Sequence, residues 1–359
     1  MTNKNNTRIA SLDGARAVAI ALVVFSHMQS SLPLLWRIDR GNFALHYGRY
    51  LDLGNLGVRV FFVISGFLIT SLLMREQLAT GRISLKQFYL RRFFRIMPAY
   101  WVYLGTVAVL MPFGIATADW HKLTEAFLYF GDYRWLAGAL SHTWSLSVEE
   151  QFYLLWAPLL VLLGNWRVRY ACLALLLAGP TFRMLSDGGM WPSSSKYAFE
   201  CVCDALASGC ALALFRESLW RIGAYQEAIE SRWPWYWVIT ALALMTGFTP
   251  YWVRDLIGIP LLNVSIVVLL DKYMRYPELG FGRFLNARPV IWVGVLSYSI
   301  YLWQELFAWA YIPALAKIAG ILATASASYY LIERPLLGLR ARLRAKPIPP
   351  AIHSRAAAP

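Results

Sequence analysis

The sequence contains little charge for its length. Only 15% of its 359 residues are Asp, Glu, Lys or Arg, whereas 58% are hydrophobic, and the mean hydropathy is +0.47. So little polar side-chain surface could not cover a soluble globule. The composition therefore excludes an ordinary soluble enzyme and indicates an integral membrane protein.

Cysteine is also scarce, and its spacing excludes two kinds of site. Cys172, Cys201, Cys203 and Cys210 all lie in apolar segments and form no C-x-x-C pair. Zinc sites and disulfide frameworks both need paired cysteines at regular spacings. We therefore expect four small core residues and no bound metal.

The apolar residues form long runs that do not alternate in polarity as the strands of a membrane barrel would. Ten spans of about 20 residues are predicted, at 13–34, 54–74, 93–112, 143–164, 168–186, 197–215, 233–250, 253–271, 289–311 and 313–332. The fold prediction is all-α: a polytopic transmembrane helical bundle of about ten helices. Residues 1–335 would form one membrane domain, and the basic, Pro- and Ala-rich tail at 336–359 is expected to be disordered.

The net charge of +14 could indicate nucleic acid binding, but membrane topology explains it better. If the N-terminus is cytoplasmic, the predicted cytoplasmic segments hold more than twice as many Lys and Arg residues as the outer ones. Cytoplasmic loops of membrane proteins are enriched in both residue types. We therefore predict that both termini are cytoplasmic and that nucleic acid is not a partner.

The first apolar run, "SLDGARAVAIALVVFSHMQS" (11–30), carries two ionisable residues. Arg16 and His27 are eleven residues apart, so they share one helix face and are separated along the axis by roughly 16 Å. An anion-binding group would then lie near the cytoplasm and a titratable base deep in the membrane. The alternative is that Arg16 reaches lipid phosphates and His27 makes a structural hydrogen bond.

The segment "FYLRRFFRIMPAYW" (88–101) places three arginines, Arg91, Arg92 and Arg95, at the cytoplasmic start of the third span. Arg92 and Arg95 are one turn apart on the same face, and guanidinium pairs suit phosphate groups. Topological signalling alone would also account for these charges.

The segment "SHTWSLSVEEQFYLLWAP" (141–158) brings Glu149 and Glu150 into the membrane from the outer side. Glu149 would lie about 10 Å below the outer end of its span, at a depth similar to that of His27. The expectation is a carboxylate that orients the imidazole, with Ser145 as a nearby hydroxyl. Both acids could instead lie in water at the interface.

Five ordered motifs resemble the membrane acyltransferase 3 family: "LDGARAVAIALVVFSH", "GVRVFFVISGFLIT", "FYLRRFFRIMPAYW", "HTWSLSVEEQFYLLW", and "LSYSIYLWQ" followed by "LIERP". The resemblance covers about residues 10–335. Members of the family are bacterial inner-membrane O-acyltransferases that modify surface polysaccharides, lipopolysaccharide O-antigen, Nod factors, peptidoglycan or macrolides. The resemblance thus implies a multi-pass protein of the bacterial inner membrane, in contact with its lipids.

The resemblance also implies roles for particular residues. The family's arginine and histidine motif matches Arg16 and His27, with the histidine as catalytic base. Its arginine motif, associated with the acyl donor, matches Arg91, Arg92 and Arg95, and its Trp-Ser-Leu-x-Val-Glu motif includes Trp144, Ser145 and Glu149. One departure is Gln304, where many relatives have histidine, so a titrating role at that position is in doubt.

The resulting hypothesis is an acyl-CoA-dependent O-acetyltransferase with no permanently bound cofactor. Acetyl-CoA, or another short acyl-CoA, would bind as co-substrate at the arginines, with Arg16 assisting. His27, oriented by Glu149, would deprotonate a hydroxyl of a carbohydrate or lipid-linked saccharide. The oxyanion would be stabilised by Ser145 or by a backbone amide at a helix break near Ser65 and Gly66.

Several alternatives remain open at the level of sequence. Transfer could be direct or could pass through a covalent acyl-enzyme. Acceptor specificity is expected in the outer loops 35–53 and 113–142. A different class of function, a proton-coupled transporter of an anionic solute or saccharide, would use His27 and Glu149 as a proton relay. A scaffold for polysaccharide assembly would leave both residues without a role.

Overall fold

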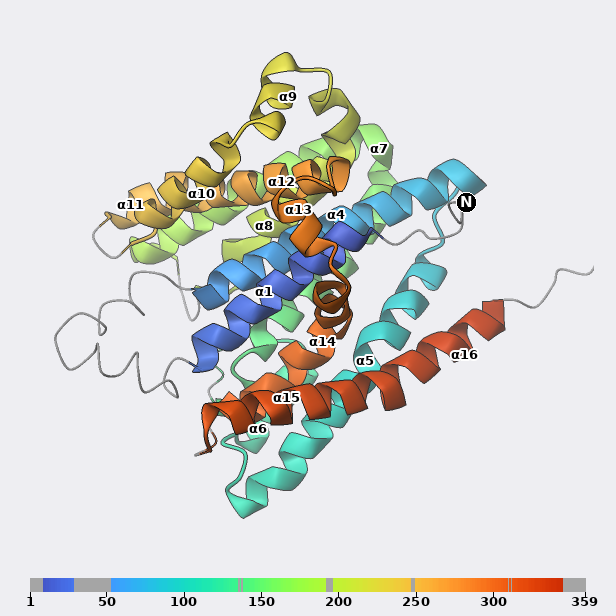
Figure 1. The fold of residues 1–359 in the computed structure, drawn as a ribbon, viewed down its shortest axis with the longest axis vertical. Helices are drawn as coiled ribbons and strands as arrows, with labels where there is room; N and C mark the ends of the chain where they lie inside the picture. The colour runs from blue at the N-terminus through green and yellow to red at the C-terminus, as the bar shows by residue number, and fades with distance from the viewer. Residues whose placement is uncertain are drawn as a thin grey trace, which may run out of the picture.

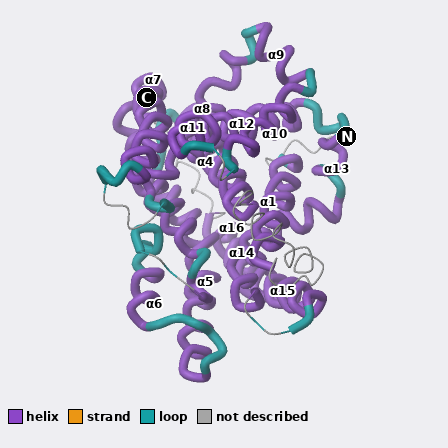
Figure 2. Tube along the Cα trace, turned by 90° about the vertical axis from the view of Figure 1, so that its left-hand side faces the viewer, coloured by secondary structure: helices purple, strands orange, loops and turns teal. Residues whose placement is uncertain are grey.

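The computed structural model describes residues 9–28, 53–134, 136, 138–191, 196–246, 249–308, 310 and 312–344. Throughout these ranges the chain is helical or irregular and contains no strand (Figure 2). The α-helices are α1 (Ala10–Met28), α4 (Leu53–Thr80), α5 (Leu85–Leu110), α6 (Trp120–Phe127), α7 (Thr143–Asp187), α8 (Phe199–Leu219), α9 (Gly223–Glu230), α10 (Trp233–Leu244), α11 (Tyr251–Val253), α12 (Ile259–Arg275), α13 (Phe281–Leu285), α14 (Arg288–Ala308), α15 (Ala314–Ser328) and α16 (Arg334–Arg344).

Seven helical stretches are long and apolar enough to cross a membrane, which confirms an all-helical, multi-pass membrane protein. The predicted spans at 143–164 and 168–186 correspond to the two halves of α7, which meet at a kink where Gly164 has a non-helical φ of 67°. The span predicted at 197–215 is α8, which is 21 residues long but is not among the seven apolar stretches. The span predicted at 233–250 contains α10, which has only 12 residues. Ten spans and cytoplasmic termini therefore stay predictions.

The first helix lies between two others. α1 packs against α4 on one side and α14 on the other (Figure 1). At the contact with α14, a Cβ atom added to Gly294 would lie 1.8 Å from the backbone oxygen of Asp13. Only glycine permits this approach, which is typical of membrane helices held together by small residues.

Glycine contacts of the same kind join α4 to α8. A Cβ atom on Gly66 would lie 2.0 Å from the Leu206 oxygen, and one on Gly209 would lie 2.0 Å from the Val63 oxygen. The reciprocal glycines bring the two backbones into contact and fix how α4 is placed in the bundle. Because α4 carries Ser65, this contact also sets the position of a predicted site residue.

The C-terminal segment is not uniformly irregular. Residues 329–333 form a π-helical turn that continues into α16, so the predicted tail begins as helix and not as disordered chain. α16 extends away from the other helices in Figure 1. Residues 345–359, and all but the last residue of the predicted outer loop 35–53, lie outside the described ranges.

Candidate active site

Two cavities lie along α1. The first, here called the histidine cavity, has a volume of about 170 Å³ and is lined by residues that include Ser26, His27, Asn55, His142, Trp144 and Tyr301. The second, the arginine cavity, has a volume of about 80 Å³ and is lined by residues that include Arg16, Ser65, Arg92, Arg95, Glu149 and Tyr301. The shared helix face of Arg16 and His27 therefore gives each cavity one ionisable residue from α1.

His27 is held by two neighbouring residues of α14. Its Nδ1 atom lies 2.9 Å from Gln304 Oε1 and 3.0 Å from Glu305 Oε2. Glu305 is 2% exposed, whereas the His27 side chain is 33% exposed. A carboxylate thus faces the imidazole from inside the protein, as a base-orienting acid does in hydrolases.

Further hydrogen bonds fix the orientation of these groups. Gln304 Nε2 donates to Glu305 Oε2 over 2.9 Å, and Ser141 Oγ donates to Glu305 Oε1 over 2.6 Å. Because the Gln304 amide nitrogen is directed at the carboxylate, its oxygen is the atom that faces His27. Nδ1 therefore meets acceptor oxygens and carries a hydrogen, which leaves the basic lone pair on Nε2.

The pairing of His27 with Glu149 is corrected by this geometry. Glu149 lines the arginine cavity, where its carboxylate accepts hydrogen bonds from Ser65 Oγ over 2.7 Å and Tyr153 Oη over 3.1 Å. A similar depth in the membrane, as the sequence predicts for these two residues, does not decide which helix faces which. The acid beside the imidazole comes from α14.

The expected helix break near Ser65 and Gly66 is also wrong. Both residues lie well inside α4, where the helix has no interruption. Their backbone amides are engaged in helical hydrogen bonds and offer no oxyanion site. The Ser65 side chain instead supports the carboxylate of Glu149.

The three arginines of α5 separate into two groups. Arg92 and Arg95 line the arginine cavity with Arg16, and the Arg92 guanidinium lies over the Tyr153 ring at 4.9 Å. Arg91 does not line this cavity; its Nη2 donates to Glu76 Oε2 over 2.7 Å. Arg91 and Arg95 are also one turn apart on α5, so it is the ion pair with Glu76 of α4 that holds the Arg91 side chain away from the cavity.

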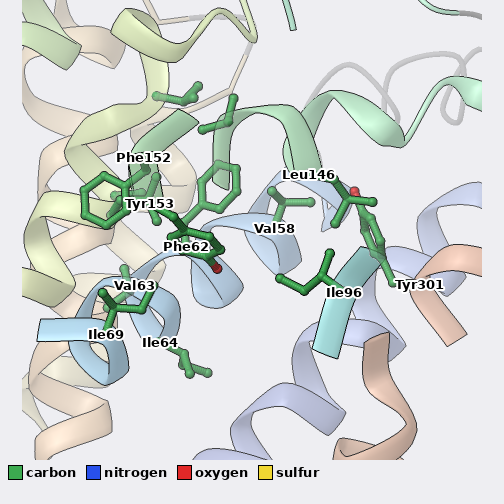
Figure 3. Close-up of a cluster of buried hydrophobic side chains, with 14 of the residues drawn as sticks. Val58, Phe62, Val63, Ile64, Ile69, Ile96, Leu146, Phe152, Tyr153 and Tyr301 are labelled. Atoms are coloured by element: carbon green, nitrogen blue, oxygen red, sulfur yellow. The ribbon is translucent and has the colours of Figure 1, made fainter. Parts of the chain in front are cut away.

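A shared wall separates the two cavities. Tyr301 and Val58 line both of them, and Figure 3 shows these two side chains beside Ile96 and Leu146. The Tyr301 hydroxyl lies 2.5 Å from Ser145 Oγ and donates to the His142 backbone oxygen over 2.8 Å. The predicted residue Ser145 therefore belongs to the wall.

Trp144, another predicted residue, lines the histidine cavity. Its ring stacks on that of Tyr197 with a centroid distance of 4.4 Å and an interplanar angle of 30°. A broad aromatic surface thus borders the cavity that contains His27. Such surfaces suit the apolar face of a sugar ring as well as lipid or protein contacts.

Two residues at this site were not identified from the sequence: Glu305, which contacts His27, and His142, which lines the histidine cavity. Glu305 follows directly after Gln304, and an acid on an otherwise apolar span was a usable signal. His142 is 2% exposed, and within the described residues neither ring nitrogen has a hydrogen-bond partner. Buried polar atoms are usually satisfied, so this second imidazole is suited to contact a substrate.

The cysteines are buried and free, as the sequence predicts for core residues. Among the described residues there is also no cluster of His, Cys, Asp and Glu that could hold a metal ion. The polar groups that line the two cavities include imidazole, carboxylate, hydroxyl and guanidinium groups.

Comparison with known proteins gives a consistent family assignment. Residues 9–332 match the profile of the family described as "Acyltransferase domain". The chain is 27% identical to "Peptidoglycan O-acetyltransferase OatA" of Listeria monocytogenes over 376 residues, covering 93% of this chain and 57% of that protein. It is 27% identical to "Putative peptidoglycan O-acetyltransferase YrhL" of Bacillus subtilis over 376 residues, covering 91% and 55%. It is 26% identical to "O-acetyltransferase OatA" of Staphylococcus aureus over 377 residues, covering 91% and 57%.

The chain thus spans a little over half the length of these relatives. No solved structure gives a significant match. The family profile nevertheless covers nearly the whole chain, including the elements that carry both cavities. The chain belongs to the membrane acyltransferase 3 family.

Proposed function

We propose that this protein is an inner-membrane O-acetyltransferase that moves an acetyl group from cytoplasmic acetyl-CoA to a hydroxyl of a cell-surface glycan. The observation that carries the proposal is the oriented His27 and Glu305 pair in a cavity that shares a wall with a cavity of three arginines. A base and an anion-binding group on opposite sides of one wall suit a reaction whose two substrates arrive from different sides.

In the proposed reaction, His27 acts as general base through Nε2. The acceptor oxygen attacks the thioester carbonyl carbon while its proton passes to Nε2. The carbon–sulfur bond then breaks, and the CoA thiolate takes the proton back from the imidazolium. The products are an O-acetyl ester and free CoA thiol. Glu305, 3.0 Å from Nδ1, stabilises the imidazolium between the two proton transfers.

The wall supplies the proposed oxyanion donors. The Ser145 and Tyr301 hydroxyls have two protons between them, and both oxygens lie within reach of the His142 backbone oxygen. One of these protons can turn from that carbonyl toward the tetrahedral intermediate, where the negative charge makes the hydrogen bond stronger.

The arginine cavity is the proposed donor site. Its three guanidinium groups outnumber its one carboxylate, Glu149, so it favours an anion such as the phosphates of CoA. A volume of about 80 Å³ holds an acyl group but not a nucleotide. The nucleotide would therefore bind at the cytoplasmic mouth, with the pantetheine arm reaching inward.

The relatives' names guide the choice of acceptor. Two of them are named for peptidoglycan, and the proposed acceptor is accordingly a glycan of N-acetylated amino sugars. The histidine cavity offers it an aromatic surface at Trp144 and an imidazole at His142. This proposal takes the place of lipopolysaccharide among the acceptors implied by sequence resemblance.

The test is release of CoA thiol from acetyl-CoA by the purified protein in lipid nanodiscs, with peptidoglycan fragments as acceptor. His27→Ala should lower acceptor-dependent release at least 100-fold, a loss typical of a missing general base. His121→Ala is the matched control, because His121 is an exposed residue of α6 that lines neither cavity. A folded wild-type protein that neither binds nor consumes acetyl-CoA would favour the transporter instead.

A further inference from the structure

A third cavity lies near the histidine cavity and is here called the Arg59 cavity. Its volume is about 260 Å³, and its lining includes Asn55, Arg59, Arg183, Ser186, Tyr197 and Arg254. The start of α4, the end of α7, the turn before α8 and the segment after α11 supply these residues. The start of α4 and α11 lie toward the same side of the bundle in Figure 1. It is the largest of the three cavities, and the proposed reaction does not use it.

The charged side chains around this cavity form ion pairs with one another. Arg183 binds Asp204 through two parallel contacts of 3.0 and 2.9 Å, and Arg59 lies 3.7 Å from the same carboxylate. Arg254 donates to Asp255 and also forms an ion pair with Asp187. Lys196, which also lines the cavity, pairs with Asp187. Four cations thus share three carboxylates, and the site presents fixed donors and acceptors with an excess of one positive charge.

Two buried polar atoms beside the cavity lack a partner. Ser186 is 8% exposed and Arg183 is 6% exposed, and within the described ranges no hydrogen bond reaches Ser186 Oγ or Arg183 Nε. Leaving such atoms unsatisfied costs free energy. A hydroxyl-rich ligand would satisfy both, because a hydroxyl can donate as well as accept.

The Arg59 cavity adjoins the cavity of the proposed base. Asn55 and Tyr197 line both cavities. The Tyr197 ring, stacked on Trp144, therefore forms a continuous aromatic border between them. Asn55 Oδ1 accepts a hydrogen bond from Arg59 Nε over 3.1 Å, which links the two sets of polar groups. A chain of sugars could follow this border, with one unit in each cavity.

We infer that the Arg59 cavity binds a second sugar unit of the acceptor, so that the acceptor is an oligosaccharide and not a single sugar. The inference rests on the proposed function. The largely compensated charges favour a neutral unit that uses its hydroxyl and amide groups. Guanidinium N–H groups would donate to sugar oxygens, and Ser186 Oγ would exchange a hydrogen bond with a sugar hydroxyl.

The test compares acetyl transfer to N-acetylglucosamine and to its β-1,4-linked tetrasaccharide. The wild type should show a higher kcat/KM for the tetrasaccharide. Ser186→Ala should lower kcat/KM for the tetrasaccharide about 3- to 10-fold more than for the monosaccharide, the effect of one hydrogen bond. Since no described group bonds Ser186 Oγ, the substitution removes no hydrogen bond of the folded protein, and the thermal unfolding midpoint of the variant should match that of the wild type.

The matched control is Ser328→Ala. Ser328 is also a buried serine whose Oγ atom has no partner within the described residues, and it lies in α15 and lines none of the three cavities. This variant should transfer acetyl groups to both acceptors as the wild type does. As a second variant, Lys196→Gln changes an exposed residue at the cavity rim and should raise KM for the tetrasaccharide only.

The outcomes separate the inference from the proposed function. Equal wild-type kcat/KM for both acceptors, or equal losses for both in Ser186→Ala, would mean that this cavity holds only water and would overturn the inference. Absence of transfer to any saccharide by the folded wild type would instead refute the proposed function, and the inference would fall with it.

Discussion

Replacing Glu305 by glutamine tests which carboxylate supports the base. In the wild type, Glu305 Oε2 accepts from His27 Nδ1 and Gln304 Nε2, and Oε1 accepts from Ser141. In Glu305→Gln the amide oxygen can keep the first two hydrogen bonds, and the amide nitrogen can donate to the Ser141 hydroxyl. The variant therefore preserves the shape of the network and removes only its negative charge.

The size of the effect follows from the distance. Two unit charges 3.0 Å apart attract each other by about 5 kcal/mol at an effective dielectric constant of about 20. His27 is one third exposed, so solvent screens part of this and the imidazolium should lose about 2 to 3 kcal/mol. Glu305→Gln should therefore lower kcat for acetyl transfer about 30- to 160-fold, with little change in the KM for acetyl-CoA.

Glu149→Gln is the matched variant in the other cavity. It changes a carboxylate that lies with Arg16, Arg92 and Arg95, so its main effect should be on the KM for acetyl-CoA. Both variants would be compared in nanodiscs by CoA release across a range of acetyl-CoA concentrations. The reasoning is refuted if Glu305→Gln retains kcat within threefold of the wild type while Glu149→Gln loses it.

Three further predictions concern the donor site, the helix packing and a buried acid. Arg92→Ala should raise the KM for acetyl-CoA about 10- to 100-fold, the range for a lost hydrogen bond to a charged group. Arg91 lies outside the cavity, so Arg91→Ala should keep this KM within threefold of the wild-type value. Equal effects of the two substitutions would contradict the assignment of Arg92, and not Arg91, to the donor site. Gly66→Ala forces a methyl group to within 2.0 Å of an α8 carbonyl and should lower thermal stability by about 1 to 3 kcal/mol or more, whereas Gly105→Ala, with nothing within 4 Å, should not. Burial raises the pKa of Asp132 to about 6, above the 3.8 of an exposed carboxyl. The folded protein therefore binds this proton more tightly than the unfolded chain does, which stabilises the fold by up to about 3 kcal/mol below pH 4. This contribution is lost as the pH rises through 6. Asp132→Asn should remove that pH dependence from the thermal unfolding midpoint, and an unchanged profile would contradict it.

Helical periodicity predicted the parts of the site that lie on one helix. It placed Arg16 and His27 on one face of α1, and these residues do reach two cavities with a common wall. It also grouped Arg92 with Arg95, and both line the arginine cavity. In each case the relevant spacing is local, and local spacing fixes direction within a helix.

Contacts between distant helices could not be predicted in the same way. Glu149 and Glu305 both come from spans with suitable acids, and nothing in one sequence decides which of the two spans faces α1. The choice depends on glycine contacts such as that of Gly294 with the Asp13 backbone, which draws α14 against α1. For the same reason the sequence could not show that Gln304, which departs from the family's pattern, is a direct hydrogen-bond partner of His27.

The shared wall has a consequence for the membrane itself. Tyr301 and Val58 border both cavities, so the two cavities meet at these two side chains. In the proposed reaction, the acetyl group that passes this wall carries no net charge, and CoA remains on the cytoplasmic side. Such an arrangement would let the cell export acyl groups without creating an electrical leak or drawing on its ion gradients.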